Sequence, residues 1–237
     1  MNYRRIAIAI ALILTACKEA PPPGSRTAGP QVRATVVTIR TTLEPEKTIT
    51  HHAIVIAGDR VRLTNEYDGW RLFNVKESTV TFVDDVERTA RTQPYATLAK
   101  ERVRALAREL PSHYPEVSFE PTSESRVIHG VSAVRHDLEV GAWRRELWLA
   151  QHPSIPKGLF AMMTASERAT TPLAPMMRPA IESAMEADGF PFIDRSEVTF
   201  GDQKIVVLRE VVKIEEKNVP EALVTLPRGY KDLTVTP

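Results

Sequence analysis

The sequence predicts an α+β protein that is mainly β, and three observations predict it. Short segments rich in Val, Ile and Thr recur after Gln31, separated by turn-forming pairs such as Gly58-Asp59 and Gly141-Ala142. Apolar residues at helical spacing interrupt them over Tyr95–Leu110. A second helical segment, Pro153–Asp188, is broken by prolines. Because tight turns join short strands, we expect an antiparallel meander.

The segments before the first helix differ in how many faces they bury. Val61 and Leu63 alternate with polar residues, which predicts one buried face, whereas Ile54-Val55-Ile56 in succession predicts cover on both faces. Turns are expected at Gly58-Asp59 and Asp68-Gly69. The predicted strands are Val32–Leu43, Lys47–Ala57, Arg60–Glu66, Trp70–Lys76, Thr79–Val83 and Val86–Thr92.

The clearest hairpin follows the first helix. Val131–Val140 places Val134, His136 and Leu138 on one face, with Arg135 and Asp137 on the other. The remaining predicted strands are Trp143–Ala150, Pro191–Phe200, Lys204–Glu216 and Ala222–Leu226.

The N-terminus has the three parts of a secretory signal. Two arginines precede an apolar run, Ile6–Leu14, and small residues follow it before Cys17. The apolar run is too short to span a bilayer as a helix. Leu14-Thr15-Ala16-Cys17 resembles the bacterial lipobox, whose cysteine receives a diacylglyceryl group and, after cleavage, a further acyl chain such as palmitate. Two or three acyl chains anchor a protein stably, whereas one does not.

The same N-terminal pattern predicts where the protein resides. Cys17 is the one cysteine of the chain, so an intramolecular disulfide is excluded. Lys18 replaces the aspartate that the lipoprotein pattern associates with inner-membrane retention, which implies the bacterial outer membrane. The body then lies in the periplasm, or on the cell surface, which the sequence does not distinguish. Residues 18–30 are a Pro-rich tether that spans about 40 Å when extended.

Composition restricts the class of partner. The 31 basic and 30 acidic residues balance, so no nucleic-acid partner is expected. A hydrophobic content of 43 % and a charged content of 26 % are typical of a globular domain. The expected partners are the membrane, through the acyl chains on Cys17, and either an apolar ligand such as a lipid or an envelope protein.

Signals for catalysis and metal binding are weak. His51 and His52 are adjacent on a predicted strand and point to opposite faces, so they do not readily share one metal ion. Ser154-Ile155-Pro156-Lys157 has the S-x-x-K spacing of penicillin-recognising serine enzymes, but the chain lacks the partner motifs. We therefore expect no catalytic residue, no metal ion and no cofactor, and we expect that the protein is not an enzyme.

Methionines gather in the proline-broken segment. Apart from Met1, every methionine lies between residues 162 and 185. Flexible methionine side chains cover surfaces of variable shape, so the segment is either a lid over an apolar cavity or a helix that closes the core of a curved sheet. The lid interpretation assigns ligand contacts to Met162, Met163, Met176 and Met177.

Four short motifs and one tryptophan carry a family resemblance over residues 31–237. They are Gly58-Asp59-Arg60-Val61-Arg62, Val127-Ile128-His129-Gly130 before a hairpin that ends in Trp148, Asp188-Gly189-Phe190-Pro191 and Leu226-Pro227-Arg228-Gly229-Tyr230. Their order resembles an uncharacterised bacterial lipoprotein family with a domain of unknown function, which is similar to the periplasmic and outer-membrane lipoprotein-carrier fold. That resemblance implies a single domain built as a curved, half-open antiparallel β-barrel with helices covering its concave face, and a habit of holding acyl chains.

Three functions from different classes follow. The preferred hypothesis is a non-catalytic, outer-membrane-anchored binding module for a lipid or another apolar ligand. The alternative is a structural or interaction lipoprotein with a filled core and no ligand. A hydrolase of envelope material is the third, and it lacks a nucleophile and a base at plausible spacing.

Overall fold

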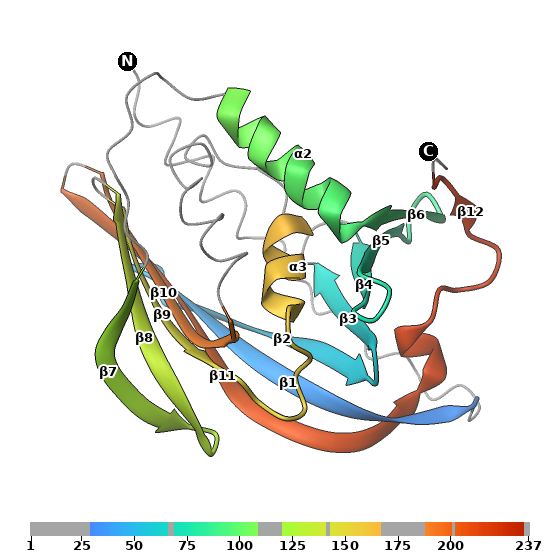
Figure 1. The fold of residues 1–237 in the computed structure, drawn as a ribbon, viewed down its shortest axis with the longest axis horizontal. Helices are drawn as coiled ribbons and strands as arrows, with labels where there is room; N and C mark the ends of the chain where they lie inside the picture. The colour runs from blue at the N-terminus through green and yellow to red at the C-terminus, as the bar shows by residue number, and fades with distance from the viewer. Residues whose placement is uncertain are drawn as a thin grey trace.

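The protein folds into one open sheet of twelve strands with helices on its concave side (Figure 1). The computed structural model describes residues 29–65, 69–108, 120–140, 143–166, 188–200 and 202–234. The expected signal peptide, Cys17, Lys18 and most of the tether lie outside these residues. The predicted class, α+β and mainly β, is confirmed.

The elements follow the predicted order with three additions, β7, η2 and β12. The helices are α2 (Tyr95–Arg108) and α3 (Leu159–Ser166), and η2 (Glu221–Val224) is a 3-10 turn. The strands are β1 (Gln31–Glu44), β2 (Thr48–Ala57), β3 (Arg60–Asn65), β4 (Gly69–Asn74), β5 (Thr79–Asp84), β6 (Thr89–Pro94), β7 (Glu120–Ile128), β8 (Val131–Val140), β9 (Trp143–Ala150), β10 (Phe190–Phe200), β11 (Gln203–Pro220) and β12 (Lys231–Asp232). Within the described ranges, no helix is long and apolar enough to cross a membrane.

Two meanders join at the middle of the sheet. The strand order is β12-β6-β5-β4-β3-β2-β1-β11-β10-β9-β8-β7, so β1 pairs with β11 although they lie near opposite ends of the chain. This pairing is antiparallel from Gln31 opposite Pro220 to Glu44 opposite Val206, with a bulge at Thr38/Ile39. Every other pair is antiparallel except β12 with β6. The predicted antiparallel meander is confirmed for β2 to β6.

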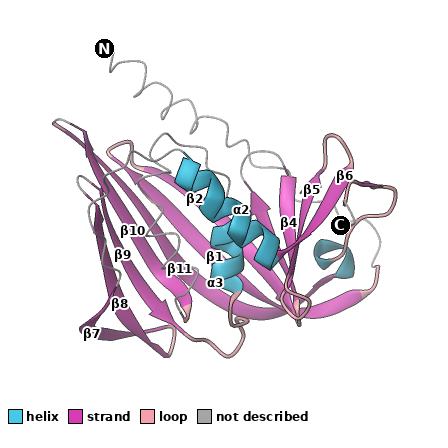
Figure 2. Ribbon diagram, turned by 45° about the horizontal axis from the view of Figure 1, so that its top comes forward, coloured by secondary structure: helices cyan, strands magenta, loops and turns pink. Residues whose placement is uncertain are grey.

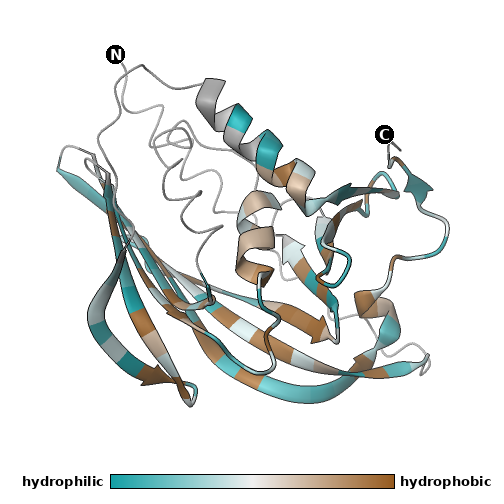
Figure 3. Cartoon of the chain, viewed as in Figure 1, coloured by the Kyte–Doolittle hydropathy of each residue, from teal (hydrophilic) through white to brown (hydrophobic). Residues whose placement is uncertain are grey.

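The concave face carries the main core. Side chains alternate between the two faces of each strand, and the inward set packs with Leu98 of α2 and with α3. Figure 2 shows both helices lying across the sheet, and Figure 3 shows hydrophobic bands along the strands beneath them. The fully buried members of this inward set include Val37, Ile54, Val61, Phe73 and Val80.

A second, smaller core covers the opposite face of β1 and β2. Val36 and Ala57 pack there with Val224 of η2, which is fully buried, and Val55 packs against the same cluster. The predicted cover on both faces of Ile54-Val55-Ile56 is therefore confirmed, because Ile54 and Ile56 face the main core.

Two sequence predictions are wrong, and one strand lies where none is predicted. Ala222–Leu226 is not a strand, because Glu221–Val224 turns to insert Val224 into the outer core. Residues 85–88 form a turn rather than the start of β6, since the Asp84 carboxylate accepts hydrogen bonds from the backbone N–H groups of Val86 and Glu87. The strand β7 was not predicted, because its polar sequence lacks an alternating apolar pattern.

Two turns depend on backbone with positive φ. His129 and Gly130 join β7 to β8 with φ of 48° and 78°, as a two-residue hairpin requires. Gly69 opens β4 with φ of 132° against the backbone of Val83, where a Cβ would overlap the carbonyl oxygen. A glycine is therefore required at Gly69.

Candidate functional site

The helix α3 lies inside the concavity rather than on its rim. Seven of its eight residues are buried, so it has no polar outer face. Met162 is 4 % exposed, and Met163 is partly buried against the main core. From β4, the guanidinium of Arg71 donates a hydrogen bond of 2.7 Å to the hydroxyl of Ser166. This hydrogen bond ties the end of α3 to β4, and α3 also lies beside α2 and β10.

Two of the four methionines of the predicted lid lie within the described residues. Met162 and Met163 lie on the concave side as the lid hypothesis requires. Met176 and Met177 lie outside the described residues. A helix that is buried on all sides fills a core, so α3 itself favours the filled-core interpretation for this half of the concavity.

A row of polar side chains crosses the other part of the concave face. It runs through five neighbouring strands, from β2 to β9, and register and alternation place it on the same face as Val37 and Leu147. Its members are His52 on β2, Thr41 on β1, Arg209 on β11, Asp194 on β10 and Arg145 on β9.

Hydrogen bonds connect most of this polar row. The ring Nε2 of His52 lies 2.9 Å from Oγ1 of Thr41. Arg145 donates from Nε and Nη2 to the two carboxylate oxygens of Asp194, at 2.9 and 3.0 Å. Arg209 donates from Nη1 to Asp194 Oδ2 at 3.3 Å. Thr41 sits directly opposite Arg209 in the β1–β11 register, which completes the row.

Asp194 is the buried centre of the polar row. Asp194 is 6 % exposed. Burial by itself raises the pKa of this carboxyl group, but the positive charges and hydrogen bonds of Arg145 and then Arg209 outweigh burial and lower the pKa below its ordinary value. Asp194 is therefore a carboxylate at neutral pH, and it holds two guanidinium groups in place.

The two arginines of the polar row differ in accessibility. The Arg145 side chain is 12 % exposed, whereas the Arg209 side chain is 51 % exposed. Since Asp194 contributes one negative charge to two arginines, the described members of this cluster carry one positive charge in excess. Arg209 presents that charge at the accessible surface.

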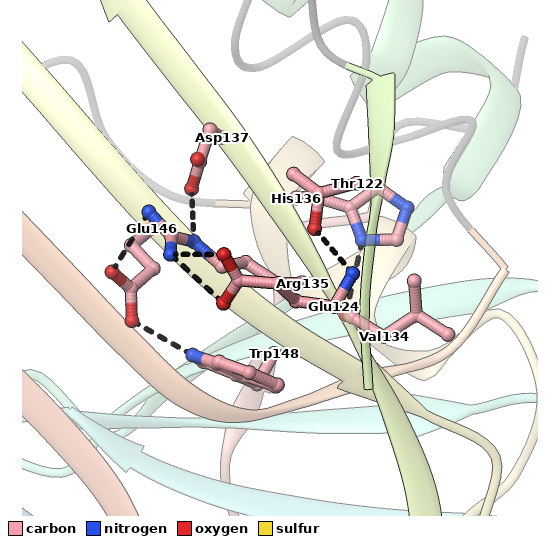
Figure 4. Close-up of polar contacts among 8 residues, drawn as sticks. All are labelled: Thr122, Glu124, Val134, Arg135, His136, Asp137, Glu146 and Trp148. Atoms are coloured by element: carbon pink, nitrogen blue, oxygen red, sulfur yellow. Dashed lines mark hydrogen bonds and ion pairs between the residues drawn. The ribbon is translucent and has the colours of Figure 1, made fainter. Parts of the chain in front are cut away.

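The opposite face of β8 to β11 carries a dense charge network. Arg135 contacts Asp137, Glu124 and Glu146 at 2.7, 3.1 and 3.5 Å, and Glu146 accepts a hydrogen bond from the indole N–H of Trp148 (Figure 4). The hydrogen bonds that Arg135 donates to Asp137 and Glu124 raise the pKa of Arg135. The network lines a groove of about 460 Å³ formed by Arg135, Asp137, Leu138, Glu139, Arg144, Arg145, Glu146, Arg195, Glu197 and Lys204.

The charges that line this groove pair with one another. Arg144 contacts Glu139, and Glu197 contacts both Arg195 and Lys204. Exposed pairs of this kind contribute little free energy each. Apart from Arg145, which binds Asp194 of the polar row, the lining holds four basic and four acidic side chains, so neither sign of charge is in excess. The polar row on the concave face is therefore the better candidate site.

The two adjacent histidines of β2 keep the separation that the sequence predicts. His51 and His52 point to opposite faces of β2, since His51 pairs with Arg40 and His52 with Ile39, and the predicted geometry is confirmed. Within the part of the chain that the structure describes, no group of three or more His, Cys, Asp or Glu side chains could hold a metal ion.

The S-x-x-K match has the wrong local structure for a serine enzyme. Ser154 lies in a turn, where its backbone N–H donates to Nδ1 of His152, and α3 begins only at Leu159. The serine therefore does not open a helix that brings Lys157 within reach one turn later.

Comparison with known proteins gives no family. No family model and no curated protein matches the chain. Two solved structures of PNGF-II, in C2 and P21 crystal forms, are similar to it at 14 % and 13 % sequence identity with TM-scores of 0.47 and 0.45. Each match covers 86 % of this chain, which spans 31 % and 32 % of the length of those structures.

Proposed function

We propose that the protein is an outer-membrane-anchored lipoprotein whose domain binds a lipid or another apolar ligand on the concave face of the sheet, without catalysis. The observation that carries the proposal is the curved sheet with an apolar inner face, on which α3 lays Met162 and Met163. Concave, mainly apolar surfaces with a few polar groups are typical of ligand sites. In this proposal the open sheet is the half-open barrel of the lipoprotein-carrier fold.

The N-terminal sequence supports the location. The lipobox-like tetrad ending in Cys17 supplies the acyl chains, and Lys18 favours the outer membrane. Residues 18–30 then act as the tether that lets the domain face the periplasm.

The alternative function is a structural or interaction lipoprotein of the envelope with a filled core. The burial of seven of the eight residues of α3 favours it for the part of the concavity that α3 occupies. In this alternative the partner is an envelope protein and the concave face takes no ligand.

Native mass spectrometry tests the proposal. An unacylated version that begins near Lys18 is expressed in the periplasm, and whatever copurifies is extracted into organic solvent. A stoichiometric adduct with the mass of a phospholipid or fatty acid is expected. A protein that stays free of ligand after incubation with envelope lipids would contradict the proposal and leave the interaction lipoprotein.

A substitution in α3 separates the two functions. If Met163 lines a ligand site, Met163→Asp abolishes the adduct while the far-UV circular dichroism and the cooperative unfolding transition persist. If α3 only fills the core, the same change unfolds the protein, because an unpaired carboxylate is buried. Val86→Asp is the control, since Val86 is 83 % exposed in a turn.

A further inference from the structure

We infer that Arg209 is the head-group site of the concave face, and that the ligand it selects is a phospholipid with a singly charged phosphodiester. This inference rests on the proposed function and adds the ligand's chemical class to it. It is carried by the polar row, in which a buried carboxylate holds two arginines and leaves the charge of one accessible.

The arrangement holds Arg209 in place without neutralising it. Asp194 accepts two hydrogen bonds from Arg145 at 2.9 and 3.0 Å, and a single longer one of 3.3 Å from Arg209. The carboxylate is therefore engaged mainly by Arg145. Arg209 uses one Nη in this contact and keeps the rest of a side chain that is 51 % exposed. A guanidinium fork fixed at one end is preorganised for an oxyanion.

The surroundings of Arg209 favour an amphiphile over a free anion. Along β11, Val207 and Val211 flank Arg209 on the same face, and on β1 the inward neighbours of Thr41 are Ile39 and Leu43. Apolar side chains thus lie on both sides of the polar row. A ligand that places one negative charge at the row and apolar groups on either side matches this pattern.

This pattern selects a diacyl phosphodiester. The row crosses the strands with apolar positions on both sides, so a head group that joins two acyl chains fits it better than the terminal carboxylate of a single chain. A phosphodiester also carries a negative charge, which complements the accessible guanidinium of Arg209.

The test compares two diacyl lipids that differ only in the head group, together with a single-chain carboxylate. The full-length chain is purified in non-ionic detergent and titrated, with native mass spectrometry as the readout, against dioctanoyl phosphatidylglycerol, dioctanoylglycerol and laurate. We expect phosphatidylglycerol to bind at least about tenfold more tightly than dioctanoylglycerol, since charge-assisted hydrogen bonds are worth that much. Arg209→Gln should reduce this preference by about tenfold, and Arg209→Lys by less, because lysine keeps the charge and loses the fork.

A matched arginine provides the control. Arg195 lies on β10, its side chain is 41 % exposed, and it points to the opposite face, where it contacts Glu197. Arg195→Gln should leave the preference unchanged. Arg209→Gln removes an accessible group and leaves the Arg145–Asp194 pair intact, so we expect it to fold; its thermal midpoint is measured alongside.

The other outcomes separate this inference from the proposed function. If the two dioctanoyl lipids bind equally, or if Arg209→Gln keeps the preference, the head-group site is wrong although the domain still binds lipid. Tighter binding of laurate than of phosphatidylglycerol contradicts the phosphodiester. If no probe binds, the proposed function fails and the inference fails with it. Should Arg209→Gln not fold, an unchanged preference in Arg209→Lys contradicts the inference.

Discussion

The two halves of the concave face each bury an arginine, and the group that accepts its hydrogen bond differs between them. Under α3, Arg71 is 9 % exposed and donates to the neutral hydroxyl of Ser166, among apolar residues such as Phe73. At the β9–β11 end, Arg145 binds the carboxylate of Asp194, and a second arginine, Arg209, stays accessible. Buried apolar residues such as Leu147 and Phe192 extend the main core to the β9–β11 end, and there Arg209 keeps a charge within reach of solvent.

This difference separates stability from recognition. A helix buried on all sides supports the sheet, so changes beneath α3 should alter the free energy of unfolding. A buried ion pair contributes little net stability, because desolvation offsets the attraction, yet removal of one partner is costly. The polar row therefore holds Arg209 in place at little net gain in stability, as a binding site requires.

The largest expected effect comes from removal of the shared carboxylate. Asp194→Ala removes the carboxylate that accepts hydrogen bonds from the buried Arg145 and from Arg209, and it should cost about 3–5 kcal/mol of unfolding free energy. Urea denaturation measures it. The control is Asp137→Ala, whose side chain is 47 % exposed on the other face and which should lose less than about 1 kcal/mol. Equal losses in the two variants would show that the Asp194 cluster does not behave as a buried unit.

The next effect concerns the closed half. Leu159 of α3 is fully buried, and Leu159→Ala should cost about 3 kcal/mol through the lost burial and the cavity. Leu226→Ala makes the same change at a residue that is 43 % exposed, with an expected loss below about 0.5 kcal/mol. We expect Leu159→Ala to leave any preference between phosphatidylglycerol and dioctanoylglycerol unchanged. A lost preference would contradict the separation between the two halves.

Acid should reduce the contribution of Asp194, at the β9–β11 end, to the free energy of unfolding. The folded-state pKa of Asp194 lies below its ordinary value, so the native state binds fewer protons than the unfolded state between the two values. The stability from this group is present above about pH 4, the unfolded value, and is lost as the pH falls through the folded value. Asp194→Asn should flatten the acid limb of a plot of unfolding free energy against pH. Asp202→Asn, at an exposed turn, should not change that limb.

The smallest expected effect is the change in stability with pH that comes from His152, just after β9. Burial, and then the electrostatic effect of nearby His129, lower the pKa of His152, whose ring lies 6.2 Å from that of Phe192. The unfolded state therefore takes up the proton first, and stability declines as the pH falls below about 6.5. His152→Gln should reduce the loss of stability between pH 7.5 and 5.5. His51→Gln, which removes an exposed ring, is the control, and the same reduction there would contradict the assignment.

Local patterns in the sequence predicted most of the fold. Alternation identified β3 and β8, and Gly58-Asp59 marked the turn between β2 and β3. The same method missed β7, since Glu120–Ile128 lacks an apolar face, and β12, which is two residues long. It assigned a strand to Ala222–Leu226, where the buried Val224 shows that tertiary packing decides the conformation.

The polar row could not be predicted in the same way. Its residues come from five strands, and their proximity depends on the pairing of β1 with β11 and of β9 with β10, which no local pattern specifies. One weak signal existed: Asp194 falls on the inward register of an otherwise apolar strand start, Phe190–Ile193. The clustering of the methionines is visible in the sequence, but the sequence does not show that Met162 is a buried core residue.

The pairing of β1 with β11 has a consequence for how the chain acquires its structure. Arg33 and Glu216 form a contact across this pair although they lie 183 positions apart. The long edge of β1 therefore stays without its neighbour until β11 has been synthesised. Because contacts between distant residues slow folding, we expect slow, cooperative closure of the sheet. Until closure, β1 is an open edge on which other chains can add, so a chaperone that shields this edge would raise the yield.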